Sequence, residues 1–319
     1  MNSQKAVAVV ILGVILSVLA GCVPNAEMKL NLSPQSQTNY RVVTETGKDY
    51  VFVQPSINKT KESHTVGRVE MVFSQSVQAV DANGNATANI TIKEIKYLSE
   101  GAKGARFDFD STAESDKDNP LSALIGQSYK IKISPDGQVQ PLDVQAVRSA
   151  VKADSTAKKI TDKLFSDSEI KNRHQVLALM DAGKSVKNKG DKWSSIIGSP
   201  KGMLIPKSFE KIYTVAYVKT QGSDRIATVS MTAVPSSKRA EDMPKEEPEV
   251  GFFAKMFDEK DNYTGKMVIN LTNGQIISYQ ETLKAEWFAA ESPEEQKSDK
   301  GPDNLTMGFT SSYSIEKVD

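Results

Sequence analysis

The chain contains several runs in which apolar and polar residues alternate with a period of two. The clearest spans residues 86–97, where Ala88, Ile90 and Ile92 fall on one side and polar residues fall between them. Such alternation is typical of a strand in an antiparallel sheet, with one face buried and the other solvated. Comparable runs occur at 66–80, 129–133, 212–218, 226–234, 266–271, 275–288 and 305–318. The pattern therefore predicts a mainly β (α+β) protein.

Short turn sequences separate these runs. Asp81–Asn85 and Ser134–Gly137 have the Asp, Asn, Pro and Gly content of tight hairpin turns, and we also expect a turn at Gly47–Asp49. Residues 291–303 are polar and indicate a hairpin tip. These turns make hairpins the expected way in which consecutive strands are connected.

The period changes to that of a helix near residue 143. Val144, Val147 and Val151 are spaced as one helical stripe, and Ser166 with Glu169 matches a capping box at the start of a further helix. We predict two or three short helices within residues 143–183.

The second half of the chain echoes the first. The run at 87–92 resembles that at 226–231, and the hairpin at 130–139 resembles that at 266–276. We therefore predict two related antiparallel curved sheets or half-barrels joined by a short helical segment. The expected division is a signal at 1–21, a tether at 22–38, a β unit at 39–142, a helical connector at 143–190, and a second β unit at 191–319 with an insertion at 235–262.

The first residues have a different character. After Lys5, an apolar run extends from Ala6 to Leu19, which is the length of the apolar region of a secretory signal peptide. The sequence Leu19-Ala-Gly-Cys22 resembles the lipobox of bacterial lipoproteins. That resemblance implies cleavage before Cys22 and attachment of a diacylglycerol, with palmitate-type acyl chains, to its sulfur. An ordinary signal peptide or an N-terminal anchor helix is the alternative.

The resemblance also implies an address. We expect a lipid-anchored protein of the bacterial cell envelope. Lipoproteins kept at an inner membrane often carry Asp after the cysteine, whereas Val23 stands here. In an organism with two membranes, we therefore expect the outer membrane, at its periplasmic or surface face.

Charge and cysteine content narrow the possible partners. The chain has 40 basic and 40 acidic residues, and loss of residues 1–21 would leave a net charge of −1. A near-neutral chain lacks the basic excess that is typical of nucleic-acid-binding proteins. We therefore expect no nucleic acid as a partner. Because Cys22 is the only cysteine, an internal disulfide or a site with several thiolates is impossible.

The layout of the mature chain is similar to that of exported bacterial lipoproteins grouped as a domain of unknown function, DUF6263. The similarity rests on the strand that begins with Tyr40, the hairpin at 133–139, Gly190-Asp-Lys-Trp193 and the strand at 264–269. It covers most of residues 28–318, and it brings no catalytic residues. A looser similarity, in shape alone, is to open β half-barrels that carry lipids or lipoproteins in the envelope.

The sequence lacks the common catalytic motifs. The two histidines, His64 and His174, form no HExxH pair, and the chain has no GxSxG or phosphate-loop motif. His174 falls on a helical stripe with Ile170 and Leu177, which favours a packing role. We therefore expect no enzyme activity and no cofactor, with an unrecognised hydrolase as the less favoured alternative.

Two acidic segments are candidates for calcium binding. The Asp81–Asn85 segment begins like a calcium loop but lacks the required Gly and Glu at later positions. The denser cluster comprises Asp108, Asp110, Glu114, Asp116 and Asp118. We interpret the first segment as a hairpin turn and the second as a solvated loop, and we predict no metal site.

An aromatic segment lies within the charged insertion. Phe252, Phe253, Met256 and Phe257 share one face of a possible short helix. These residues could contact a ligand or partner, as a flap over a cavity or at a membrane. The alternative is a plug that covers an open end of the protein's own sheet.

These observations favour a membrane-anchored, non-enzymatic module that binds an apolar ligand, such as a lipid, or a protein partner in the concavity of its sheets. The alternative is a structural or assembly component of the outer envelope that has no ligand.

Overall fold

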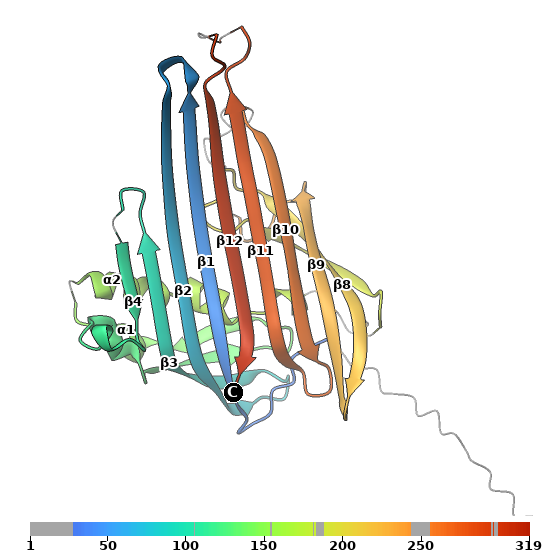
Figure 1. Ribbon diagram of the computed structural model, residues 1–319. Coiled ribbons are helices and arrows are strands. Elements are labelled where there is room, and N and C mark those ends of the chain that lie inside the picture. Colours follow the sequence, from blue (N-terminus) through green and yellow to red (C-terminus); the bar gives the residue numbers. More distant parts are fainter. Residues whose placement is uncertain are drawn as a thin grey trace, which may run out of the picture.

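A computed structural model describes residues 28–104, 106–153, 155–180, 182, 188–243, 256–294, 296 and 299–319. Cys22 and the signal expected at residues 1–21 lie outside this part of the chain. Within it, the predominance of β structure is confirmed (Figure 1). The strands are β1 (Gln37–Gln54), β2 (Lys59–Val80), β3 (Ala86–Glu100), β4 (Arg106–Asp110), β5 (Ser128–Ile133), β6 (Val139–Asp143), β7 (Lys192–Gly198), β8 (Ser208–Gln221), β9 (Asp224–Ser236), β10 (Asp258–Asn270), β11 (Gln275–Ala290) and β12 (Asn304–Val318).

The strands form one continuous antiparallel sheet of twelve strands. Their order is β6-β5-β3-β2-β1-β12-β11-β10-β9-β8-β7, with β4 paired to the far end of β3. The first and last strands are thus neighbours at the centre, where Asn39 pairs with Val318 and Val53 with Asn304. The prediction of two separate sheets is not confirmed, because this β1–β12 pairing joins the two halves of the chain edge to edge.

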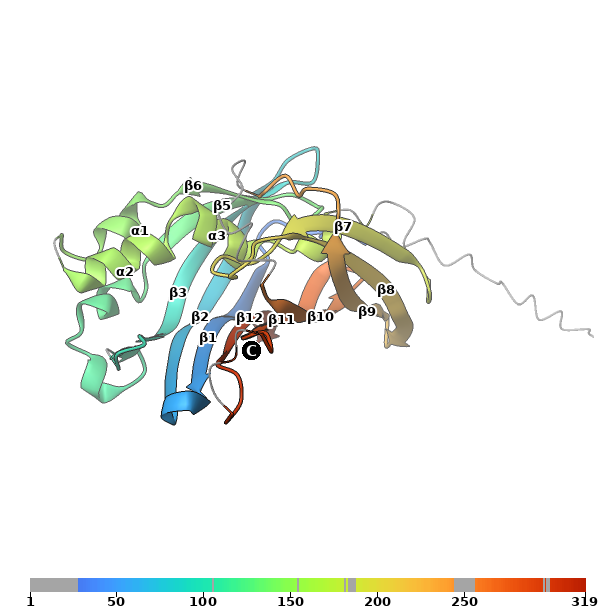
Figure 2. The same ribbon diagram turned by 90° about the horizontal axis from the view of Figure 1, so that it is seen from above.

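The short helices predicted within residues 143–183 are confirmed. Along the chain they connect β6 to β7, the two edge strands of the sheet. They are α1 (Gln145–Ser149), α2 (Thr156–Leu164) and α3 (Asp167–His174), followed by the 3-10 turn η4 (Leu177–Leu179); three further 3-10 turns are η1 (Pro55–Ile57), η2 (Glu114–Asp116) and η3 (Pro120–Leu124). Ser166 caps α3 by accepting a hydrogen bond from the Glu169 amide at 3.3 Å. Figure 2 shows that these helices, with β5 to β7, lie opposite the central strands. None of the described helices is long and apolar enough to cross a bilayer.

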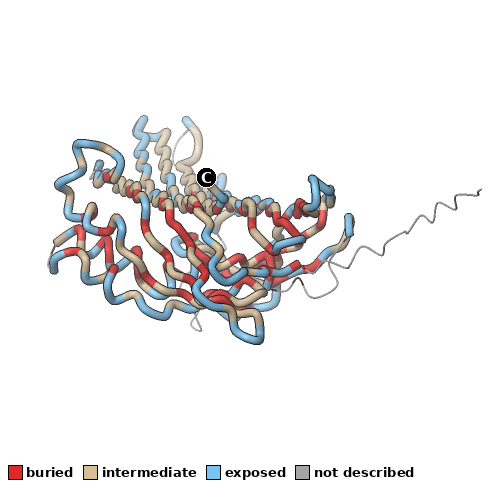
Figure 3. Tube along the Cα trace, turned by 90° about the horizontal axis from the view of Figure 1, so that it is seen from below, coloured by how far each residue is buried: buried red, intermediate tan, exposed pale blue. Residues whose placement is uncertain are grey.

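The two faces of the sheet differ in polarity. On β11, Tyr279, Leu283 and Trp287 are buried, whereas Lys284 and Glu286 between them are exposed. We call the first side the inner face and the second the outer face. Directly opposite residues of antiparallel strands share a face, so the inner face can be followed from strand to strand through the pairing. Figure 3 shows the buried positions gathered between the sheet and the layer opposite it.

Two features differ from the sequence-based expectation. Gly47–Asp49 is not a turn but the interior of β1, because pairing with both β2 and β12 keeps the backbone extended. The expected insertion at 235–262 is shorter among the described residues, since β9 runs to Ser236 and β10 starts at Asp258. The turns at 81–85 and 134–137 are confirmed, and each has a glycine with positive φ, at Gly84 and Gly137.

Part of the expected tether belongs to the folded body. Met28 and Leu30 are buried, and the Leu30 amide donates to the Pro135 carbonyl at 2.7 Å. On its other side the segment touches the β10–β11 turn, where a Cβ on Gly274 would come within 2.2 Å of the Asn31 amide nitrogen. Since Gly274 also has a positive φ of 65°, only glycine fits there. Residues 28–31 are therefore held between two hairpin turns.

Candidate functional site

The inner face is divided along the length of the strands. We call the end where β1 begins and β12 ends the lower end, and the end with the β1–β2 hairpin tip the upper end (Figure 1). Towards the lower end, α3 packs on the inner face. The ring of His174 lies 4.6 Å from that of Phe73 on β2, and its Nε2 is 2.6 Å from the hydroxyl oxygen of Tyr129 on β5. All three side chains are buried, so the sequence-based packing role of His174 agrees with its surroundings.

Burial sets the electrostatics of this region. It lowers the pKa of His174 well below its ordinary value, and the neighbouring Arg173 guanidinium lowers it further. Burial also raises the pKa of Tyr129. The buried imidazole is thus held neutral beside a neutral phenol, so this pair supplies packing and a hydrogen bond.

Arg173 is a buried cation beside this pair, and it is only 6% exposed. Its Nη2 donates to the carbonyl of Leu164 at 2.6 Å, and its guanidinium carbon lies 5.3 Å from the centre of the Phe165 ring. Its Nη1 is buried and has no hydrogen-bond partner among the described residues. The Leu164 carbonyl is one of the last in α2, so Arg173 caps the negative end of that helix.

A second polar cluster lies on the inner face of β8, β10 and β11. Lys211 is fully buried, and its Nζ is 2.5 Å from Oε2 of Glu281. The hydroxyls of Tyr279 and Tyr263 donate to the two oxygens of Glu281 at 2.6 and 3.0 Å. The Lys211 ammonium also lies 4.6 Å from the centre of the Tyr263 ring. The carboxylate is therefore surrounded by three donors.

The pKa shifts show that this cluster keeps its ion pair. Burial alone would raise the pKa of Glu281, but Lys211 and the two tyrosines hold it below the usual value. Burial and the adjacent carboxylate raise the pKa values of Tyr263 and Tyr279 well above the usual value. Glu281 is thus held ionised and the two tyrosines neutral, which favours a structural role over acid–base chemistry.

The upper end of the inner face is different. Tyr50 and Phe52 of β1 pair with Met307 and Leu305 of β12, and all four are only partly buried. We call these four residues the upper strip. It is bounded on the β11 side by the buried Trp287, which pairs with Met307, and on the β2 side by Lys61, whose Nζ lies 5.9 Å from the Tyr50 ring centre.

The β7–β8 loop (residues 199–207) marks the lower limit of the upper strip. A Cβ on Gly202 would lie 3.3 Å from the Lys48 side chain and 3.7 Å from the Phe309 ring, so this loop crosses the inner face at that level. Lys201 of the loop lies 3.9 Å from Glu169 of α3. The helices and the loop therefore cover part of the inner face below the strip, while Thr46 and Lys48 of β1 stay exposed there.

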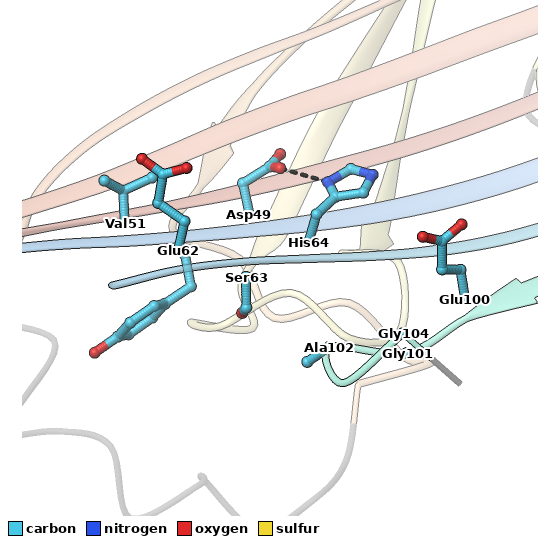
Figure 4. Close-up of a pocket in the computed structure, with 10 residues that line it drawn as sticks. Asp49, Val51, Glu62, Ser63, His64, Glu100, Gly101, Ala102 and Gly104 are labelled. Atoms are coloured by element: carbon cyan, nitrogen blue, oxygen red, sulfur yellow. Dashed lines mark hydrogen bonds and ion pairs between the residues drawn. The ribbon is translucent and has the colours of Figure 1, made fainter. Parts of the chain in front are cut away.

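A shallow depression adjoins the strip at the edge of β2, beyond its last pairing with β3. Its volume is about 360 Å³, and its lining combines β1 and β2 residues with the β3–β4 turn. Figure 4 shows Asp49 and His64 on one side of the strands, joined by a 2.6 Å contact between Oδ1 and Nδ1, and Ser63 on the other side. Both members of the Asp49–His64 pair are more than half exposed, so this is a surface ion pair of small energetic value.

The residues singled out from the sequence are distributed as follows. Cys22, Phe252 and Phe253 lie outside the described residues. Met256 is 56% exposed, whereas Phe257 is partly buried and packs against the core just before β10. The proposed joint contact face of these aromatic residues is therefore neither confirmed nor contradicted.

Four of the five members of the acidic cluster have partners within the protein. Asp108 binds Arg106, Asp110 binds Lys96, and Glu114 binds Lys117. Asp116 accepts a hydrogen bond from the Asp110 amide at 2.7 Å. Among the described residues, no three His, Cys, Asp or Glu side chains are grouped so that they could hold a metal ion.

Sequence reasoning missed the Lys211–Glu281 cluster. The sequence does carry a signal for it. The alternating pattern places Lys211 on the same strand face as Phe209 and Tyr213, and Glu281 on the same face as Tyr279 and Leu283. A charge at an inward parity within an apolar strand implies a buried partner of opposite charge. Which two charges meet could not be read from the sequence, because 70 residues separate them.

A model of a family of unknown function, DUF6263, matches residues 83–276, more than half of the chain. The chain belongs to this family. No curated protein matches the chain. The family thus contributes no activity, ligand or partner.

Solved structures give only distant likenesses. A lipovitellin structure concerned with lipid–protein interactions has a TM-score of 0.41 and 11% identity, covering 90% of this chain. This chain spans about a quarter (25%) of that one. OccK2 (OpdF) of Pseudomonas aeruginosa has a TM-score of 0.20 and 7% identity, covering 91% of this chain and 100% of its own. A DUF1329 protein of Desulfovibrio piger has a TM-score of 0.11 and 8% identity, covering 86% and 85%. At these scores the likenesses establish neither a shared fold nor a function.

Proposed function

We propose that this protein is a lipid-anchored lipoprotein of the bacterial envelope, at the outer membrane where two membranes exist, and that its inner face binds an apolar ligand. The observation that carries the binding proposal is the upper strip. Four large apolar side chains, Tyr50, Phe52, Leu305 and Met307, stay partly exposed on a face whose lowest positions, such as Tyr40 and Phe73, are buried. A contiguous apolar patch of this kind is typical of a binding surface.

The polar groups around the strip support binding without catalysis. Lys211 and Glu281 are satisfied by each other and by tyrosines. His174 is buried beside Tyr129 below the strip. A general acid or base needs a titratable group within reach of substrate, and neither group offers one. We therefore propose a non-enzymatic module.

A substitution on the strip tests the binding proposal. Met307→Lys places a charge on the inner face, and Thr306→Lys places the same charge on the outer face one residue away. Purified protein is titrated with a dansyl-labelled fatty acid, and fluorescence reports binding. We expect Met307→Lys to weaken binding by about tenfold or more, equivalent to about 1.4 kcal/mol, and Thr306→Lys to leave it unchanged. Equal effects of both, or no binding by the parent protein, would contradict the proposal.

The packed lower half favours a second candidate, a structural or assembly component of the outer envelope that has no ligand. Buried residues from both halves of the chain form one continuous cluster, which extends to Trp287 beside the upper strip, as in an ordinary protein interior. This version requires a stable protein neighbour. Mild detergent extraction after cross-linking should then recover a fixed complex, whereas the ligand-binding version predicts a free protein from which a lipid can be extracted.

The anchor is tested independently of binding. Cells given labelled palmitate should incorporate it into the protein, and Cys22→Ser should abolish both the label and membrane association. A full-length protein still beginning at Met1, with no acyl mass, would overturn the anchor and leave the binding proposal intact.

A further inference from the structure

The first described residues, 28–31, lie at the lower end of the folded body. Leu30 is hydrogen-bonded to the β5–β6 turn, and Asn31 lies against Gly274 in the β10–β11 turn. The neighbouring Met28 is only 3% exposed. Any attachment upstream therefore begins from a fixed point between two hairpin turns, and not from a freely moving tail that starts at β1.

Chain length limits how far this point can stand from an anchor. Six residue-to-residue steps separate Cys22 from Met28. Even when fully extended, at about 3.3–3.6 Å per residue, they span only about 20 Å. If Cys22 carries the acyl chains, the lower end is held within that distance of the bilayer.

The upper end is much farther away. β1 runs from the lower end to the hairpin tip through 18 residues, which at about 3.3 Å each gives a height of about 60 Å. The tip carries Ile57, which is 62% exposed. On the outer face, exposed charged residues such as Lys284 and Glu286 flank single exposed apolar side chains such as Phe288, so charge interrupts the apolar area that could lie on a bilayer.

We propose that the body stands with its lower turns against the anchoring bilayer, so that the upper strip and the hairpin tip face away from that membrane. This inference rests on the proposed anchor at Cys22. The membrane-facing surface comprises the β2–β3, β5–β6 and β10–β11 turns, and its partner is the headgroup layer of the bilayer. An occupant of the upper strip then arrives from the aqueous side and not directly from the anchoring membrane.

Energy transfer tests the orientation in the full-length acylated protein. Acylation blocks the thiol of Cys22, so a single introduced cysteine can carry a fluorescent donor. Ala82→Cys places it in the β2–β3 turn, and Ser56→Cys places it at the hairpin tip; both positions are exposed. The protein is reconstituted in phosphatidylcholine vesicles that contain an acceptor-labelled headgroup lipid.

We expect strong transfer from position 82 and at least severalfold weaker transfer from position 56. A further variant carries a flexible Gly/Ser segment of about 20 residues between residues 27 and 28, which adds a root-mean-square reach of about 25 Å. It should reduce transfer from position 82.

Equal transfer from both positions, or stronger transfer from position 56, would overturn the orientation. An intact acyl mass at Cys22 in the same sample would show that the anchor itself holds. Absence of that mass, together with failure to bind vesicles, would overturn the anchor and the orientation with it.

Discussion

The lower and upper halves of the inner face are built on the same strands but have different surroundings. On β1 and β2, the lower positions Tyr40 and Phe73 are 5% and 0% exposed, and Phe73 packs against His174 of α3. On the same β1 strand, Tyr50 and Phe52 are only partly buried. Whether a position on this face is core or surface therefore depends on the elements packed over it, and not on the alternating pattern of the strand itself.

The difference in burial between the two halves has an energetic consequence. A side chain that is fully buried stabilises the fold through transfer from water and through packing, at roughly 1.5–3 kcal/mol for a large apolar residue. A side chain left half exposed retains part of that energy, which becomes available when a ligand covers it. Substitutions in the two halves should therefore separate stability from binding.

The largest expected effect is at the buried ion pair, midway between the two halves. Glu281→Ala leaves the Lys211 ammonium buried without a carboxylate, which typically costs about 3–5 kcal/mol. Urea denaturation followed by circular dichroism measures the loss. The matched control is Glu286→Ala, an exposed outer-face carboxylate of the same strand, for which we expect a change within about 0.5 kcal/mol.

A similar loss in Glu281→Ala and Glu286→Ala would contradict the view that the cluster is structural. Replacing both partners, as in Lys211→Met with Glu281→Leu, should recover much of the stability, because no charge is then left unpaired.

The second effect is at the base of the covered half. Phe73→Ala removes a fully buried ring that contacts His174 and Tyr40, and we expect a loss of about 3–5 kcal/mol. Phe73→Leu should cost distinctly less, since most of the volume stays filled. If thermal and urea unfolding showed a loss below about 1 kcal/mol for Phe73→Ala, the covered half would not be a packed core.

The third effect is a pH dependence that only the covered half should show. The pKa of His174 is lowered in the folded state, so the unfolded chain binds a proton at a higher pH than the native chain does. Stability is therefore fully present above the unfolded pKa of about 6.5, and falls as pH decreases below it, by up to about 1.4 kcal/mol per pH unit. Unfolding free energies at pH 7.5, 6.5 and 5.5, values chosen to bracket that pKa, measure the slope.

The control for this slope keeps the tyrosine partner. His174→Gln, which cannot be protonated, should flatten the dependence between about pH 6.5 and 5.5, whereas His64→Gln at the surface should leave it in place. An unchanged slope in His174→Gln would assign the pH dependence to other groups.

The alternating pattern predicted much of this fold, but not how its strands are ordered. Alternation at 86–97 gave β3 and the inner-facing Ile90 and Ile92, and the Ser166–Glu169 pair gave the start of α3. The single sheet depends on pairing between Asn39 and Val318, at opposite ends of the chain. No local pattern encodes a contact over that separation.

The candidate site was predictable only in part, for the same reason. Residues 305–318 show one alternation throughout, yet Ile315 is buried while Met307 of the upper strip is only partly buried. Alternation identifies the face of a residue but not what covers it. The turn expected at Gly47–Asp49 was wrong because glycine and aspartate are poor strand formers locally, and pairing on both sides of β1 outweighs that preference.

The smallest expected effect on stability is at the upper strip, and it is the sharpest test of the comparison. Met307→Ala removes a partly exposed side chain, so we expect a loss of about 1 kcal/mol or less. Binding of the dansyl-labelled fatty acid should nevertheless weaken severalfold, because the ligand loses an apolar contact. Phe73→Ala should show the opposite combination, with a large loss of stability and, at temperatures where it remains folded, little change in affinity. If Met307→Ala destabilised the protein as much as Phe73→Ala, the strip would belong to the core, and the two halves would not differ.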